Sequence, residues 1–422
     1  MANPNEGSLG NQIDGHIEDI LRAGKYAVVD LDVLGNNIAI VRKTLPRGVR
    51  LMVVVKGNAY GHGRIMAAHC ARRHGADMLG TNSVLEGREL RRSGIDLPIL
   101  VFDPPREEDY GSFGRYHLSA TVENERQARG ISSAAATAKP IPVHVKIDMG
   151  LGRFGARPAE AYALLAAIES LPGLALEGVY THFARRMRKV DLRESFERFD
   201  LLIGNLRRSG FDIPMAHCAE SRIWSEFPEM SSDMVRIGNA IYGTLNGRHP
   251  DLGDPFSAYC RINRVRKFEA GSKIGYGAKW TGRDILIGIV PAGQADGLVG
   301  ERIPATVSPL WFLRKAAKHF LSSFALSRNL EIPSARPEFI GDGKRLTCVE
   351  ISMNHSLIEV DEGTEAGDWV EIRTSRLDLS FPILYRRDGD FVAYSRRVEN
   401  FGVGIDETVG CEEEDSQVGG RD

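Results

Sequence analysis

The chain has 422 residues, 42% of them hydrophobic and 26% charged, with a formal net charge of −2. This length suffices for two domains with buried cores, and the near-balance of charge argues against nucleic acid as a partner. The five cysteines form no CxxC pair and no close Cys/His spacing, which argues against a metal site and a disulfide framework. No apolar run approaches the roughly 20 residues of a membrane span, and no signal peptide is evident, so we expect a cytoplasmic protein without a membrane partner.

In chain order, residues 1–25 are polar and are predicted to be an N-terminal extension. From Tyr26, short apolar runs alternate with helical patterns. The runs are YAVVDL (26–31), LMVVVK (51–56), PILVF (98–102), PVHVKI (142–147) and ALEGVYTHF (175–183), and the helical patterns cover 64–74, 84–93, 157–171 and 193–209. Apolar strands that alternate with helices indicate a parallel α/β sheet. About eight such units fit, which favours a (β/α)₈ TIM-like barrel over 26–258, with an open sheet as the alternative.

The pattern changes after residue 258. Short alternating segments separated by Gly/Asp turns predict a mostly antiparallel β domain over 259–405. Residues 309–330 interrupt it with apolar side chains at helical spacing, so we predict a helical insertion near 305–335, packed on the domain. A lid or a partner-docking helix is the alternative. The acidic tail 406–422 is predicted to be disordered.

The stretch VVVKGNAYGHG (53–63) contains the most informative residue, Lys56. A lysine that ends a buried apolar strand is unusual, because burying an unpaired ammonium is costly. An amine bound to an aldehyde cofactor would explain it, and catalytic side chains gather at the carboxyl ends of barrel strands. A lysine that reaches solvent from the strand end explains it equally well. Position alone leaves both interpretations open.

The residues Lys56 to Gly63 resemble the cofactor-binding motif of the alanine racemase family, the fold-type III pyridoxal-phosphate enzymes. The resemblance runs from about 26 to 403, through seven motifs in the family's order. It implies pyridoxal 5′-phosphate (PLP) as the cofactor, a Schiff base on Lys56, and a contact between Tyr60 and the cofactor phosphate. Gly57 stands where the family usually has alanine.

Two further motifs imply residues around the substrate and the cofactor ring. KIDMGLGRFG (146–155) is similar to the segment that supplies a carbamylated lysine, here Lys146, and a substrate-binding arginine, here Arg153. An arginine offers a bidentate fork for the carboxylate of an amino acid. GVYTHFA (178–184) resembles the strand whose histidine, here His182, lies against the pyridine ring.

Two motifs late in the barrel imply the rest of the cofactor site. HCAES (217–221) resembles a phosphate-site segment and carries Ser221. DMVRIGNAIYG (233–243) resembles the motif whose arginine, here Arg236, faces the pyridine nitrogen. Its Gly238 and Asn239 fall where backbone amides meet the phosphate, in agreement with the position of phosphate sites in barrels.

The second domain carries two motifs of the same family. GSKIGYGAKW (271–280) resembles the segment with the second catalytic base, Tyr276, and ISMNHSLIEV (351–360) resembles a substrate-contact segment with Met353 and Asn354. In the family these residues come from the partner subunit. The resemblance therefore implies a homodimer with shared active sites, in which Lys56 and the partner's Tyr276 serve opposite faces of an amino-acid substrate.

Four positions depart from the family pattern. Glu220 stands in place of asparagine, Gln294 in place of a phosphate-contact tyrosine, Asn354 in place of aspartate, and Arg396 in place of a tyrosine that narrows the pocket. The changes at Asn354 and Arg396 make the predicted pocket more cationic and favour a substrate other than alanine. The leading hypothesis is an amino-acid racemase. A PLP enzyme for elimination, aldol cleavage or decarboxylation, and a non-catalytic PLP-binding protein, remain as alternatives.

Overall fold

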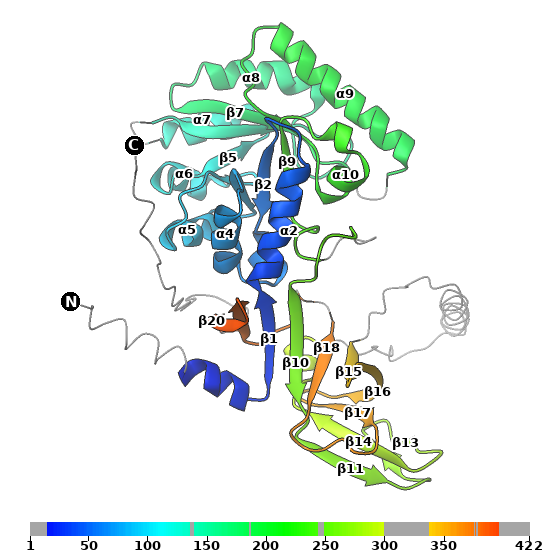
Figure 1. Cartoon of the computed structure of the whole chain (residues 1–422). Helices are drawn as coiled ribbons and strands as arrows, with labels where there is room; N and C mark the ends of the chain where they lie inside the picture. Colours follow the sequence, from blue (N-terminus) through cyan, green and yellow to red (C-terminus); the bar gives the residue numbers. More distant parts are fainter. Residues whose placement is uncertain are drawn as a thin grey trace, which may run out of the picture. The chain divides into compact units, whose positions relative to one another are not determined.

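The computed structural model describes residues 15–135, 139–184, 187–243, 249–298, 337–374, 376 and 379–395 (Figure 1). The chain forms two compact units. The barrel unit comprises Asp30–Phe256, and the β unit combines the residues up to Val29 with those from Ser257 onward. In the described part of the chain, no helix is long and apolar enough to cross a membrane. The predicted insertion near 305–335 and the tail 406–422 lie outside the described residues.

The barrel unit is built on an eight-stranded parallel sheet with the strand order β8-β7-β6-β5-β4-β3-β2-β9. Its strands are β2 (Arg50–Val54), β3 (Met78–Thr81), β4 (Ile99–Val101), β5 (Ser119–Val122), β6 (Ile141–Lys146), β7 (Leu174–Tyr180), β8 (Ala216–His217) and β9 (Met234–Ile237). The ends of this order meet, because the Arg236 amide donates to the Ala219 carbonyl at 3.0 Å and Glu220 forms a parallel bridge with Arg236. The predicted TIM-like barrel is confirmed.

Helices follow the strands and cover the barrel (Figure 1). They are α2 (Leu31–Thr44), α3 (Lys56–Tyr60), α4 (Arg64–Arg73), α5 (Val84–Arg92), α6 (Tyr110–Arg115), α7 (Glu125–Ser133), α8 (Ala161–Glu169), α9 (Lys189–Arg208) and α10 (Ser221–Glu226). The four helices predicted from apolar spacing are confirmed as α4, α5, α8 and α9. Side-chain caps fix several starts: the Asp30 carboxylate accepts from two amides of α2, and Ser83 caps α5.

The β unit contains a ten-stranded sheet in the order β11-β14-β17-β16-β15-β18-β10-β1-β19-β20. Its strands are β1 (Lys25–Asp30), β10 (Phe256–Arg261), β11 (Arg264–Phe268), β14 (Ile285–Val290), β15 (Glu338–Gly341), β16 (Lys344–Ile351), β17 (Ser356–Val360), β18 (Trp369–Arg373), β19 (Ile383–Arg387) and β20 (Asp390–Ser395). A two-stranded sheet, β12 (Lys273–Ile274) with β13 (Lys279–Trp280), is antiparallel. The pairs from β11 through β14, β17 and β16 to β15 and β18 are also antiparallel, so the predicted antiparallel β domain is confirmed.

The first apolar run belongs to the β unit and not to the barrel. The apolar pattern predicts YAVVDL as the start of the barrel, but β1 lies between β10 and β19 in the ten-stranded sheet. Its three central residues, Ala27, Val28 and Val29, are buried. A short buried apolar strand has the same sequence pattern in a parallel and in an antiparallel sheet, so local sequence could not assign its partner.

Candidate active site

The carboxyl ends of the barrel strands carry most of the residues predicted for the site. Lys56 follows β2, Lys146 ends β6, His182 follows β7 and Arg236 lies in β9. Because these strands are parallel, their carboxyl ends meet at one end of the barrel. Arg153 joins them from the segment after β6, where its charge acts on Lys56, Lys146 and His182.

The resulting cluster of cations changes the titration of its members. Burial, and then the charge of Arg153, lowers the pKa of Lys56. The same two causes lower the pKa of Lys146 to about 8. Burial and the neighbouring cations, Arg236 first, lower the pKa of His182 to about 3. The cluster therefore holds a neutral imidazole among four basic groups and provides a strong site for anions.

The turn that follows Lys56 has an unusual backbone. Gly57, Asn58 and Ala59 adopt left-handed helical angles, with φ between 52° and 60°, and Tyr60 continues them with φ 56°. Left-handed angles cost a non-glycine residue about 1–2 kcal/mol, so surrounding contacts must hold this turn. Strained backbone of this kind is concentrated at functional sites.

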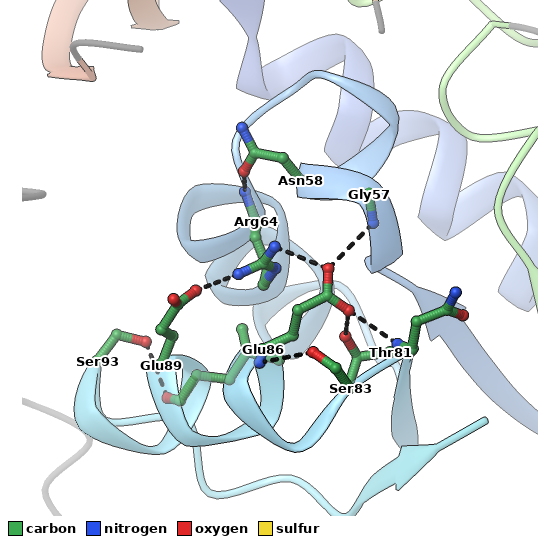
Figure 2. Close-up of polar contacts among 10 residues, drawn as sticks. Gly57, Asn58, Arg64, Thr81, Ser83, Glu86, Glu89 and Ser93 are labelled. Atoms are coloured by element: carbon green, nitrogen blue, oxygen red, sulfur yellow. Dashed lines mark hydrogen bonds and ion pairs between the residues drawn. The ribbon is translucent and has the colours of Figure 1, made fainter. Parts of the chain in front are cut away.

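One carboxylate stabilises much of this left-handed turn. Figure 2 shows Glu86, from α5, directed at the turn: its Oε1 accepts from the Gly57 amide at 3.2 Å and from Arg64 Nη2 at 2.8 Å. Its Oε2 accepts from the Thr81 hydroxyl and, at 2.8 Å, from the Asn82 amide. Arg64 also pairs with Glu89. Glu86 could not be recognised from the sequence, because it lies in an ordinary amphipathic helix with no motif around it.

The predicted phosphate residues come together at the same end of the barrel. The amides of Gly238 and Ala240 both donate to Ser221 Oγ at 3.2 Å. A Cβ on Gly238 would lie 2.6 Å from the Tyr60 hydroxyl, so only glycine allows this approach. Burial, and then the charge of Glu220, raises the pKa of Tyr60 to about 12, which keeps the phenol a hydrogen-bond donor. Asn239 follows Gly238 in the same loop.

Arg236 is buried at the centre of the barrel. Its Nη1 donates to His217 Nδ1 at 2.7 Å, and its Nη2 donates to the Thr181 carbonyl at 2.8 Å. The guanidinium lies over the Tyr180 ring, 5.4 Å from its centroid. Burial lowers the pKa of His217 well below its ordinary value, so Arg236 has neutral hydrogen-bond partners.

These residues fit a phosphorylated aldehyde with a pyridine ring. The basic cluster suits an anion, the Gly238 approach leaves backbone amides beside Tyr60 and Ser221, and Lys56 offers an amine with a lowered pKa. Asp103, which follows β4, is a further member that the sequence analysis did not single out. Burial raises its pKa, although Lys56 and Arg153 oppose that effect.

The remaining predicted residues lie in the β unit. Tyr276 belongs to the loop between β12 and β13 and is 94% exposed. The amides of Tyr276 and Gly277 donate to the two carboxylate oxygens of Glu350 at 3.0 and 3.3 Å, which fixes the loop backbone. Met353 is 63% exposed, and its neighbour Asn354 is also exposed.

Three of the four departures from the family pattern, Gln294, Asn354 and Arg396, belong to this unit. Gln294 donates to the Ile351 carbonyl at 3.3 Å. Arg396 lies outside the described residues.

Comparisons with known proteins identify relatives of the chain. The model of the alanine racemase N-terminal domain matches residues 29–246. An alanine racemase from Desulforamulus reducens is 35% identical over 282 residues, which cover 64% of this chain and 76% of the relative. One from Geobacillus kaustophilus is 36% identical over 284 residues, 64% of this chain and 73% of the relative.

A solved structure shares the fold. The alanine racemase from Bacillus anthracis has a TM-score of 0.74 at 24% identity and covers 88% of this chain and 97% of that chain. The family match over residues 29–246 and the two relatives assign the chain. It belongs to the alanine racemase family, the pyridoxal-phosphate-dependent isomerases that racemise amino acids.

Proposed function

We propose that the chain interconverts L- and D-amino acids by two-base proton transfer, with Lys56 as one base and Tyr276 of the partner subunit as the other. The observation that carries the proposal is the cluster of Lys56, Lys146, Arg153 and Arg236 around a neutral His182. It supports a site for an anionic cofactor and an amino-acid carboxylate beside a lysine amine with a lowered pKa.

The phosphate of PLP would be held by Tyr60, Ser221 and the amides of Gly238 and Asn239. His182 would lie against the cofactor ring, and Arg236 would face its nitrogen. Bound PLP supplies the electron sink that makes the α-proton of an amino acid acidic. Arg236 does not release its proton at neutral pH and gives the ring nitrogen none, which restrains competing reactions such as transamination.

The chain's own residues then bind the substrate and move its proton. Arg153 binds the substrate carboxylate through its planar fork. Lys56 Nζ accepts the α-proton on one face, which its lowered pKa favours near neutral pH. The Tyr276 hydroxyl of the partner subunit delivers a proton to the opposite face. One base on each face is what inversion requires, whereas a one-sided reaction has no need of Tyr276.

We infer that Lys146 carries a carbamate. Its pKa of about 8 leaves part of the amine unprotonated at neutral pH. The free amine adds to carbon dioxide, forms an N–C bond and releases one proton, so a cation of the cluster becomes an anion beside Arg153. We expect a carbamate signal in carbon-13 NMR of protein in labelled bicarbonate. Its disappearance below pH 7, and in Lys146→Ala, supports the assignment, and a signal unchanged in that variant contradicts it.

The substrate is the finer part of the proposal. Asn354 replaces an aspartate and Arg396 a tyrosine of the family pattern, which makes the pocket more cationic. We propose a preferred amino acid that is larger than alanine or carries an acidic group. Initial rates with all common L-amino acids give kcat/KM for each, and the highest value for alanine would contradict this part alone.

The decisive experiment uses the full chain, PLP and each L-amino acid in D₂O. We expect α-deuterium and the D-enantiomer to form together, and borohydride reduction followed by peptide mapping to find the cofactor on Lys56. Lys56→Ala should lose both signals, while Tyr276→Phe should keep the cofactor and lose inversion. Keto acid or amine products would favour elimination or decarboxylation, and no α-exchange with any amino acid would favour a non-catalytic protein.

A further inference from the structure

A chain of buried polar side chains runs through the barrel away from the cofactor site. His217 lies between Arg236 and His144: its Nδ1 accepts from Arg236 at 2.7 Å, and its Nε2 is 2.9 Å from His144 Nδ1. His144 Nε2 is in turn 3.0 Å from Glu177 Oε2. Both histidines are fully buried, whereas the Glu177 side chain is 24% exposed. The chain therefore joins the centre of the barrel to a partly exposed carboxylate.

The chemistry of the two ends determines where every proton lies. Arg236 can only donate hydrogen bonds, and an ionised carboxylate can only accept them. His217 must therefore present a bare Nδ1 to Arg236 and carry its proton on Nε2, which donates to His144 Nδ1. His144 then carries its proton on Nε2, which donates to Glu177. All three contacts are satisfied with both imidazoles neutral, and the reverse order would set two donors against each other at Arg236.

The local backbone is built to bring Glu177 into this chain. The pairing of β6 with β7 is regular up to Val143↔Leu176 and resumes at His144↔Gly178, so Glu177 is an extra residue at a β-bulge. Bulges redirect side chains and are common beside active sites. A Cβ on Gly178 would lie 2.6 Å from His144 Nδ1, so glycine leaves room for the imidazole.

Glu177 is held as a carboxylate in this position. Burial alone would raise its pKa, but hydrogen bonds from His144 and Ser119 lower it below the ordinary value. Ser119 Oγ donates to the same oxygen, Oε2, at 2.7 Å. Ser119 therefore provides a matched control, because it contacts the carboxylate without belonging to the chain of imidazoles.

We propose that Glu177 and His144 are positioning residues which, through His217, fix the orientation and the donor role of Arg236 toward the cofactor ring. The proton order follows from the geometry of this chain alone. The consequence for the cofactor rests on the proposed function, in which Arg236 faces the pyridine nitrogen. In metal sites, carboxylates that hydrogen-bond a ligating histidine fix its orientation and strengthen metal binding. By the same physical argument, Glu177 and His144 should strengthen the binding of the cofactor through Arg236.

The proton order is tested directly on the full-length protein without added PLP. Nitrogen-15 NMR of labelled histidines distinguishes the two tautomers, and His144→Gln and His217→Gln assign the signals. We expect both imidazoles to be neutral with the proton on Nε2. A proton on Nδ1 of either residue, or a charged His217 at pH 7, would overturn the proposal.

The consequence for the cofactor is tested with three variants of the holoenzyme. Glu177→Leu removes the acceptor and should weaken PLP binding about 10-fold or more and change the pH dependence of the bound cofactor's absorbance. Glu177→Gln retains an acceptor oxygen and should change the dissociation constant by less than about 3-fold. Ser119→Ala should bind PLP like the wild type.

The outcomes separate the two proposals. A Glu177→Leu protein that binds PLP with wild-type affinity and absorbance overturns the positioning role. If that variant does not fold, the tautomers of the wild type and of Glu177→Gln decide: protons on Nε2 of both histidines in both proteins support the proposed proton order, and a proton on Nδ1 in either protein overturns it. If the wild type fails to bind PLP, the proposed function is contradicted. The histidine tautomers still test the proton order from Arg236 to Glu177.

Discussion

Glu220 places a negative charge beside the residues predicted to bind phosphate. Its carboxylate contributes to the raised pKa of Tyr60, and it caps α10 by accepting from the Arg222 amide at 3.0 Å. We expect Glu220→Asn to bind PLP about 5- to 10-fold more tightly, because asparagine keeps the cap and removes a charge that repels the phosphate. Titration of cofactor fluorescence measures the change.

The control for this charge effect is Glu226→Gln in the same helix. Glu226 pairs with Arg222 and lies at the other end of α10. The Glu226→Gln substitution also removes one negative charge, but at a position away from Tyr60. It should leave the dissociation constant of PLP unchanged. An equal gain in both variants would mean that net charge, and not the position of Glu220, sets the affinity.

The lowered pKa of His182 predicts that acid destabilises the fold. Its pKa is about 3 in the folded chain, below its ordinary value of 6.5, so the unfolded chain binds the extra proton between these values. Its contribution to stability is therefore complete above pH 6.5 and decreases as the pH falls toward 3. For the protein without PLP, we expect this histidine to cost about 2 kcal/mol of unfolding free energy between pH 7 and pH 5.

Urea unfolding at the two pH values measures this loss in the wild type and in His182→Gln. The glutamine variant does not titrate and should show a loss smaller by about that amount. His117→Asn is the control, since it removes an exposed histidine from a left-handed position that asparagine tolerates. Equal pH dependence in His182→Gln and the wild type would contradict the prediction.

At the level of residues, sequence motifs predicted side chains whose chemistry is local. The barrel brings Lys56, Tyr60, Ser221 and Gly238 together because their motifs follow β2, β8 and β9, which are neighbours around the barrel. The role of Glu177 could not be predicted from the sequence, since it depends on a bulge that changes the register of β6 and β7. A hydrogen-bond chain between residues far apart in sequence has no pattern that a single sequence displays.

At the level of elements, the left-handed turn after Lys56 depends on a neighbouring helix. Both oxygens of Glu86 accept from N–H or O–H donors (Figure 2). Glutamine at this position would set an NH₂ group against those donors. We expect Glu86→Gln to lower the unfolding free energy by about 1–3 kcal/mol and to speed hydrogen exchange of the Gly57 to Tyr60 amides.

Glu89→Gln separates the turn from the ion pair. Glu89 contacts Arg64 but not the turn backbone, so its substitution should leave the exchange of the Gly57 amide unchanged. Hydrogen exchange resolved by mass spectrometry reports both variants. Equal acceleration in Glu86→Gln and Glu89→Gln would show that Arg64, and not the Gly57 contact, holds the turn.

Elements were predicted well where the pattern was long and periodic. The helices α4, α5, α8 and α9 appear where apolar spacing placed them. The partner of β1 was not predictable, because pairing is decided by residues more than two hundred positions later. Local propensity specifies a strand, whereas its neighbour in a sheet is specified by packing that only the whole chain provides.

At the level of the molecule, the proposed dimer predicts complementation between inactive variants. Lys56→Ala and Tyr276→Phe remove bases that would come from different subunits of each site. Mixed and allowed to exchange subunits, they should form heterodimers with one intact site each. We expect about a quarter of the wild-type racemase activity at equal amounts, measured against each variant alone.

A control mixture combines two variants that are both substituted in the barrel unit. In a heterodimer of Lys56→Ala with Arg236→Ala, one barrel lacks the lysine and the other lacks the arginine, so neither site is intact. Because Lys56 and Arg236 both lie in the barrel unit, this mixture should remain inactive. Activity in the first mixture equal to that in the second would contradict shared sites.

The strand order of the β unit has a consequence for how the protein is made. β1 leaves the ribosome before the barrel, but its sheet neighbours β10 and β19 are synthesised only after the entire barrel. During translation the barrel can fold before the strands that pair with β1 have been synthesised. An unpaired apolar strand promotes aggregation. A circular permutant that joins β1 directly to the β unit at the end of the chain would shorten this delay, and we expect it to give a higher soluble yield in cell-free synthesis.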